Sequence, residues 1–290
     1  LFRSDAGSRI AEFLAGNLDI LRQISTDQMT DAGRQPHVKA ALVQGPTIAY
    51  MQLDARGRAG VKALTDVRVR RAMFMALDRD QLIKLATGDF TLNAMPEGMC
   101  WKDQMACDYS VAPPAYDPAG AKKLLADAGY ASGLTLEMII TDSEETTQHQ
   151  LLQSQLKRVG IDVKFTVLPR EQHRPRLYKG DFDLYRNSGA GLLEADVDSF
   201  LYGEFHSTST LNWTGINDPE LDKFLTLTRT SLNPDARREA MRSAVKRINE
   251  QAWDPGIVHP ANWGFSQPYV RNWRPHFAGG ESEAFAWLDK

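Results

Sequence analysis

A strand, a helix and a second strand follow one another in the middle of the chain, and this succession constrains the fold most. The apolar run Leu134–Ile140 predicts a strand, and the helical spacing of residues 148–159 predicts a helix that Gly160 ends. Apolar and polar residues then alternate over residues 163–167, as they do in a strand. Such a unit forms a right-handed crossover between parallel strands. We therefore predict an α/β fold.

Three further helices are predicted to begin with the same pair of residues. An Asp or Asn that can cap the helix is followed by a proline, whose missing N–H costs nothing at the first helical position. The three pairs are Asp117-Pro118, Asp218-Pro219 and Asn233-Pro234.

Residues 69–77 carry an apolar stripe at helical spacing. The stripe predicts a helix whose buried face includes Val69 and Met73. Arg68, Arg70 and Arg71 then fall on the side that we expect to face solvent.

The composition is that of an ordinary globular protein. The chain has 290 residues, with 34 basic and 37 acidic side chains and a formal net charge of −3. This near-neutral balance gives no general reason to expect a nucleic-acid or anionic-membrane partner. No run reaches the ~18 consecutive apolar residues that a membrane-spanning helix needs. We therefore expect no membrane-spanning segment in this chain.

The two cysteines, Cys100 and Cys107, lie in a stretch rich in proline and methionine that is typical of a loop. Their spacing fits one small disulfide loop in an oxidising compartment. Two free thiols fit the spacing equally well, so the redox state stays open.

Histidines and acids form no recognisable catalytic or metal-binding pattern in the sequence. No two of the six histidines have the i, i+4 spacing of a helical zinc site. Gly189 and Gly191 begin like a dinucleotide-binding motif, but no third glycine follows. Glu194, Asp196 and Asp198 form either a solvated helix start or a negatively charged wall for a cationic ligand. The lack of a nucleophile–base pair favours binding over catalysis, and we expect no metal and no cofactor.

Several segments, in order along nearly the whole chain, resemble one family. The segments are Leu14–Ile20, Asp66–Ala72 continuing to Ala76-Leu77-Asp78-Arg79, Tyr116-Asp117-Pro118 with Ala121–Leu125 and Ala128-Gly129, and then Leu156, Gly160-Ile161 and Phe182-Asp183. Together they are similar to the extracytoplasmic solute-binding proteins of peptide, opine and nickel ABC importers, known as solute-binding protein family 5.

The resemblance implies a periplasmic-binding-protein type II fold, in which two lobes close on a ligand by a hinge. It implies that residues 63–257 form a complete second (C-terminal) lobe, and that residues 1–62 and 258–290 are a remnant of lobe one. Hinge crossings are expected near Arg56–Gly60 and Pro255–Trp263. Because family members extend further at the N-terminus, we expect this chain alone to bind ligand poorly.

The implied function is capture of a peptide or a peptide-like or opine-type molecule for delivery to a membrane permease. The expected protein is a periplasmic monomer that binds no nucleic acid. An α/β hydrolase and a periplasmic ligand sensor remain alternatives. The hydrolase predicts turnover, and the sensor predicts a membrane receptor in place of the permease.

Site residues implied by the resemblance lie in three places. The loop after the Phe182-Asp183 strand offers Arg186, Asn187, Ser188 and Gly189, and the arginine suits a ligand carboxylate. A second loop contributes Asn212 and Trp213, and a strand near the hinge contributes Tyr50 and Gln52. Peptide binders of the family commonly have an Asp a few residues after the first loop. This chain has Leu192 or Leu193 there, which argues against a plain peptide ligand.

Overall fold

The computed structural model describes residues 6–22, 28, 33–35, 37–44, 48–87, 114–141, 147–189, 198–253, 256–258, 261–275 and 285–290. Within these ranges the chain combines helices with three sheets, in agreement with the predicted α/β class. Both cysteines, the residues around them, and Leu192–Asp196 lie outside the described residues.

The chain divides into two compact units. The smaller one comprises Leu1–Thr47, Ile83–Met95 and His259–Lys290, and the larger one Ile48–Leu82 and Pro96–Val258. The smaller unit has an antiparallel sheet of order β1-β8-β2, on which Phe13, Leu21 and Phe265 form a small core. Its elements are α1 (Ala6–Leu14), β1 (Ile20–Arg22), β2 (Lys39–Gln44), β8 (Ala261–Ser266), β9 (Val270–Arg271) and β10 (Trp287–Leu288).

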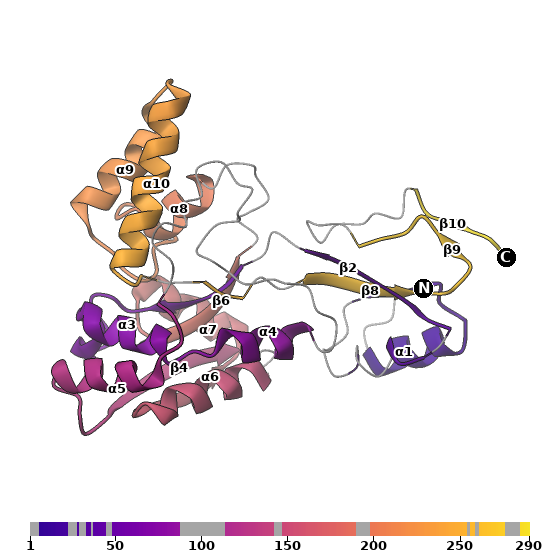
Figure 1. The fold of residues 1–290 in the computed structure, drawn as a ribbon, viewed down its shortest axis with the longest axis horizontal. Coiled ribbons are helices and arrows are strands. Elements are labelled where there is room, and N and C mark those ends of the chain that lie inside the picture. Colours follow the sequence, from indigo (N-terminus) through magenta and orange to yellow (C-terminus); the bar gives the residue numbers. More distant parts are fainter. Residues whose placement is uncertain are drawn as a thin grey trace. The chain divides into compact units, whose positions relative to one another are not determined.

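The larger unit is built on a five-stranded sheet of order β5-β4-β6-β3-β7. Strands β5, β4 and β6 run parallel, whereas β3 pairs antiparallel with both β6 and β7. In Figure 1, α8, α9 and α10 stand together on one side of this unit, and α3, α5 and α6 on the other. The elements are β3 (Ile48–Leu53), η1 (Lys62–Thr65), α3 (Val67–Met75), α4 (Arg79–Thr87, whose residues from Ile83 on are counted with the smaller unit), α5 (Pro118–Asp127), β4 (Leu134–Thr141), α6 (Thr147–Arg158), β5 (Ile161–Leu168), α7 (Arg170–Lys179), β6 (Leu184–Gly189), α8 (Asp198–Phe205), α9 (Pro219–Thr230), α10 (Pro234–Glu250) and β7 (Gly256–Val258).

The predicted strand–helix–strand unit is confirmed as β4, α6 and β5. The two strands pair in parallel from Leu134 opposite Ile161 to Thr141 opposite Leu168. The three predicted helix starts are also confirmed. Asp117, Asp218 and Asn233 each accept backbone N–H bonds from the first turn, with a proline at the next position.

The solvent-facing assignment of Arg70 is wrong. Arg68 and Arg71 are exposed, but Arg70 is only 3% exposed and donates four hydrogen bonds to backbone carbonyls. Two of these bonds reach the carbonyl of Gln251 at the end of α10, and the others reach Leu64 and Thr65. The guanidinium therefore holds α3 against the end of α10, where the helix dipole favours a cation.

Residues 56–60, expected at a hinge crossing, form a turn inside the larger unit. The carboxylate of Asp54 accepts bonds from the backbone N–H groups of Arg56 and Ala59, at 3.3 and 2.9 Å. It also pairs with Arg58 Nε at 2.9 Å. Strand β3, expected in lobe one, groups with the larger unit because it pairs along its whole length with β6.

The Arg58 guanidinium packs against two glycines that adopt the left-handed conformation, Gly180 (φ 68°) and Gly215 (φ 69°). It also donates to the Trp213 carbonyl. A Cβ atom added at Gly180 would overlap this guanidinium. Room for the Arg58 side chain therefore depends on glycine at this position.

Replacing Gly180 with alanine is expected to lower the free energy of unfolding by about 2–3 kcal/mol. Left-handed strain supplies roughly 1 kcal/mol, and displacement of Arg58 from its partners supplies the rest. Urea denaturation measures the loss. Gly129→Ala is the control, because Gly129 also has a positive φ (93°) but nothing lies within 4 Å of an added Cβ. Equal losses in the two variants would show that Arg58 plays no part.

Candidate functional site

The carboxyl ends of the parallel strands form the edge of the sheet where ligands bind in open α/β folds. Strand β6 carries Arg186 near this end, and α6 begins here because it must return the chain to the start of β5. The half-buried Arg186 donates from Nη2 to Oε1 of Gln148 at 2.6 Å, in the first turn of α6. A guanidinium beside a helix N-terminus makes this edge favourable for an anion.

The expected loop after a Phe182-Asp183 strand is wrong, because Arg186–Gly189 lie within strand β6 (Leu184–Gly189). The pairing of β3 with β6 therefore brings six of the eight predicted site residues onto neighbouring strands. Tyr50 lies opposite Asn187, Ala49 opposite Ser188, and Ile48 opposite Gly189. Gln52 lies two residues further along β3, opposite Tyr185. Nothing is described of the side chains of residues 187–189.

The side chains of Tyr50 and Gln52 face the interior, not an open surface. Both residues are fully buried, and the Tyr50 ring meets the Phe200 ring edge-on at 5.7 Å between centroids. Gln52 donates from Nε2 to Glu204 Oε2 at 2.7 Å. Direct partners across β3 and β6 share a face, so Gln52 and Tyr185 lie on the same face of the sheet. Because consecutive residues of a strand point to opposite faces, Arg186 lies on the other face. Tyr50 and Gln52 therefore support β6 from behind.

Asn212 shapes its own loop. Its Nδ2 donates to the carbonyls of His206 and Ile216, at 3.2 and 2.7 Å. Its Oδ1 accepts from the Thr214 hydroxyl and the Ile216 backbone N–H, at 2.9 and 3.0 Å. Both the nitrogen and the oxygen of the Asn212 side-chain amide are therefore hydrogen-bonded to other groups of residues 206–216.

Trp213 packs among aromatic rings on the face of β6 that Tyr185 occupies. Its ring lies 5.8 Å from that of Tyr178 and 6.3 Å from that of Tyr185, between centroids. It also packs on the cluster that contains Leu177 and Phe182. Successive residues of a strand point to opposite faces, so Trp213 and Arg186 are not brought together.

Two residues near the site went unnoticed in the sequence. Gln148 could have been found, because the first turn of a helix that follows a parallel strand lies at the carboxyl edge. Glu204 had no such signal, since an acid in an amphipathic helix normally faces solvent. Burial raises the pKa of Glu204 to about 7, although its hydrogen bond with the Tyr50 side chain acts in the opposite direction.

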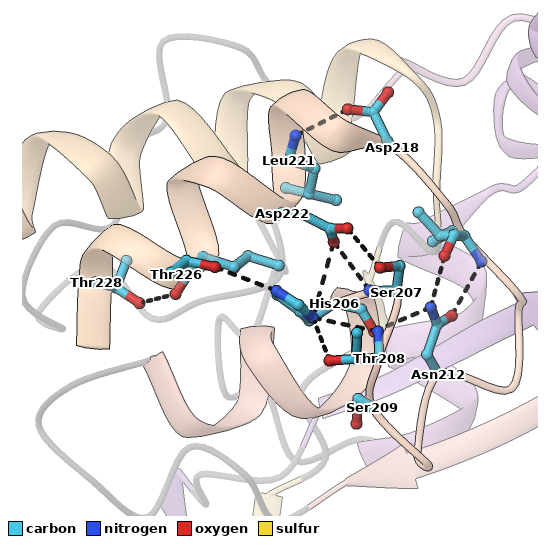
Figure 2. Close-up of polar contacts among 12 residues, drawn as sticks. His206, Ser207, Thr208, Ser209, Asn212, Asp218, Leu221, Asp222, Thr226 and Thr228 are labelled. Atoms are coloured by element: carbon cyan, nitrogen blue, oxygen red, sulfur yellow. Dashed lines mark hydrogen bonds and ion pairs between the residues drawn. The ribbon is translucent and has the colours of Figure 1, made fainter. Parts of the chain in front are cut away.

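A serine, a histidine and an aspartate also meet between α8 and α9 (Figure 2), but not as a catalytic triad. The Ser207 hydroxyl donates to Asp222 Oδ2 at 2.5 Å, and the Ser207 backbone N–H to Oδ1 at 2.9 Å. His206 contacts the hydroxyls of Thr208, at Nδ1, and Thr226, at Nε2, and its Nδ1 lies 3.9 Å from Asp222 Oδ1. A nucleophilic serine must donate to its histidine. This network therefore joins two helices.

Metal ligands and membrane spans were also sought in the described ranges. No cluster of three or more His, Cys, Asp or Glu residues there is arranged to hold a metal ion. None of the described helices is both long enough and apolar enough to cross a bilayer.

Comparison with known proteins identifies the family. Residues 2–212 match the model of the bacterial extracellular solute-binding proteins, family 5. The chain belongs to this family. Family 5 proteins bind solutes, and the fold seen here is the type II periplasmic-binding-protein fold.

Individual relatives agree with this assignment. The chain is 31% identical over 179 residues to the glutathione-binding protein GsiB of Pectobacterium atrosepticum, covering 60% of this chain and 32% of GsiB. NikA from Brucella suis, solved with Fe(III)-EDTA, superposes with a TM-score of 0.86 at 21% identity, covering 99% of this chain and 60% of NikA. A Pseudoalteromonas dipeptide-binding protein in complex with Met-Leu gives 0.78 at 20% identity, covering 99% and 57%. The chain spans about a third to a half of the length of such curated relatives.

Proposed function

We propose that this chain is part of the solute-binding component of an ABC importer. It captures a peptide or a peptide-like or opine-type small molecule outside the cytoplasm and delivers it to a membrane permease, without catalysis. The whole protein acts as a monomer and binds no nucleic acid. Membership of family 5 supports this role, as do the ligands named for its relatives, glutathione and a dipeptide.

Arg186 is the residue on which the structural argument for ligand binding rests. It lies at the carboxyl edge of the parallel strands, and Gln148 orients its guanidinium. Planar, permanently charged guanidinium groups bind carboxylates through paired hydrogen bonds. Arg186 and the residues that follow it on β6, Asn187, Ser188 and Gly189, form the carboxylate-binding part of the site, and Asn187, the direct partner of Tyr50, takes part through its backbone. Tyr50 and Gln52 support this strand from β3, and Asn212 and Trp213 shape the adjoining loop.

The larger unit represents the second lobe in this proposal. In this proposal we assign β3 to the second lobe as well, although the expected boundary lies at residue 62, because β3 is an interior strand of the five-stranded sheet. The smaller unit, which includes His259–Lys290, belongs to lobe one.

Thermal melts of the whole protein test the proposed function. The panel contains glutathione, the dipeptide Met-Leu, agropinic acid as an opine and glucose as a ligand without a carboxylate. A true ligand at a hundredfold its Kd stabilises the protein by about 2.7 kcal/mol, which raises the melting temperature by several degrees. We expect one carboxylate-bearing class to do so. Melts that are unchanged by every compound would contradict the proposal.

Replacing Arg186 with glutamine is expected to weaken binding of the identified ligand by about 10- to 100-fold. The loss corresponds to a hydrogen bond to a charged group, worth roughly 1.5–3 kcal/mol. Calorimetry on the wild type and on the variant Arg186→Gln measures it, with the exposed Arg174 replaced by glutamine as the control. Converting the ligand carboxylate to an amide should weaken binding to the wild type but have little further effect on the variant. Unchanged affinity in Arg186→Gln would remove this residue from the site.

A further inference from the structure

Glu204 connects α8 to the strand that supports the proposed site. Its carboxyl group accepts from Gln52 Nε2 at 2.7 Å and hydrogen-bonds with the Tyr50 side chain. These two residues are separated by one position on β3, so both project from the same face. On the same helix, Phe200 and Phe205 enter the core cluster that contains Tyr50. The carboxyl group therefore sits where α8 packs on the sheet.

No cation among the described side chains forms an ion pair with Glu204. The strands β3 (sequence IAYMQL) and β7 (sequence GIV) contain no charged residue. His206, in the turn after α8, contacts the hydroxyls of Thr208 and Thr226 and lies 3.9 Å from the Asp222 carboxylate. The other charged groups of α8, α9 and the second half of α10 have partners of their own or are exposed. The ion pairs are Asp198–Arg229, Arg247 with Asp218 and Glu220, and Lys246–Glu250. Asp222 accepts from the Ser207 hydroxyl, and Lys223 is exposed. Because burial takes the Glu204 carboxyl group out of water and no cation among these residues compensates for it, the neutral form is favoured.

The two protonation states of Glu204 use its neighbours differently. A neutral carboxyl group can accept from Gln52 through one oxygen and donate its own proton to the Tyr50 hydroxyl. An ionised carboxylate needs both neighbours as donors and leaves a half-buried charge without a counter-ion, which is costly. Although the ionised carboxylate accepts stronger bonds from these two donors, its desolvation cost is relieved when water reaches it. Ionisation therefore favours movement of α8 away from β3.

Strand β3 is paired with β6, the strand that carries the proposed ligand-binding residues. Tyr50 lies directly opposite Asn187, and Met51 lies directly opposite Arg186. A shift of β3 against α8 therefore acts on the strand that carries Arg186.

We propose that Glu204 is a positioning residue that makes ligand binding pH-dependent. Its neutral carboxyl group holds β3 against α8, and its ionisation weakens binding at the carboxyl end of β6. The link between Glu204 and β3 stands on the structure of the larger unit, whereas its effect on a ligand rests on the proposed function.

A ligand-free experiment on the whole protein tests the proton link. Urea denaturation between pH 4 and 8 compares the wild type with Glu204→Gln, and with Glu250→Gln as the control at an exposed glutamate. The folded state holds the proton up to about pH 7, whereas an unfolded glutamate releases it near pH 4.5. Wild-type stability relative to Glu204→Gln should therefore fall as the pH rises from about 4.5 to about 7, and stay level above that. Parallel profiles of the wild type and Glu204→Gln would overturn the link.

A binding experiment tests the positioning role. Calorimetry with glutathione and with Met-Leu at pH 6 and pH 8 spans the ionisation in the folded state. We expect wild-type affinity to be about 3- to 10-fold weaker at pH 8, the size of coupling through packed side chains, and the affinity of Glu204→Gln to be equal at both pH values. The same pH dependence in both proteins would overturn the positioning role and leave the proposed function intact. If neither probe binds at any pH, the proposed function fails for these ligand classes, while the urea profiles still decide the proton link.

Discussion

Replacing Arg70 with methionine is expected to lower the free energy of unfolding by about 3–5 kcal/mol. The substitution keeps the buried length of the side chain but removes the donors for three backbone carbonyls, those of Leu64, Thr65 and Gln251. Each polar group left unsatisfied in a buried place costs about 1–3 kcal/mol. The favourable charge at the end of α10 is lost as well.

Urea or thermal denaturation measures this loss, and the neighbouring arginine supplies the control. Arg71 is exposed and donates one bond of 2.7 Å to the Glu250 carbonyl at the same helix end. Arg71→Met should therefore cost less than about 1 kcal/mol. Arg70→Lys should recover only part of the stability, because an ammonium group cannot reach three carbonyls with the geometry of a guanidinium. Equal costs at positions 70 and 71 would show that the buried contacts of Arg70 add nothing.

Replacing Asn212 with alanine is expected to cost about 2–4 kcal/mol. The variant loses four hydrogen bonds and leaves both backbone groups of the buried Ile216 without their side-chain partner. The loop that holds Trp213 on the face of β6 should loosen with it. A fall in ligand affinity should then follow from this loosening.

The thermal stability of Asn212→Ala without ligand separates this role from direct ligand contact. The exposed Asn217 in the same connection, replaced by alanine, is the control and should change stability by less than about 0.5 kcal/mol. If Asn212→Ala melts like the wild type and loses only ligand affinity, Asn212 contacts the ligand and the structural assignment is wrong.

Much of the fold could be predicted from the sequence because its signals are local. A capping side chain followed by proline starts α5, α9 and α10, and this needs only neighbouring residues. The β4–α6–β5 unit follows from hydrophobic periodicity and from the handedness of crossovers. The choice of Arg186 came from the resemblance to family 5, and the order of the elements explains only which end of a parallel strand bears the site.

The remaining features depend on contacts between distant segments. A single sequence shows that Arg70 lies among apolar residues, but not that the end of α10, about 180 positions away, needs a donor there. Nor does it show that Tyr50 and Gln52 turn inward, because that depends on α8 covering β3. Glu204 is the clearest case, since only the packing of α8 on the sheet removes its carboxyl group from water.

Local chemistry in the sequence thus determined where α5, α9 and α10 begin, and that the sheet contains parallel strands. Tertiary structure decided which polar side chains lost their water. That outcome depends on what packs above each residue, and the covering elements come from parts of the chain that no local pattern connects. The charge of Glu204, the burial of Arg70 and the orientation of Arg186 toward Gln148 are all of this kind.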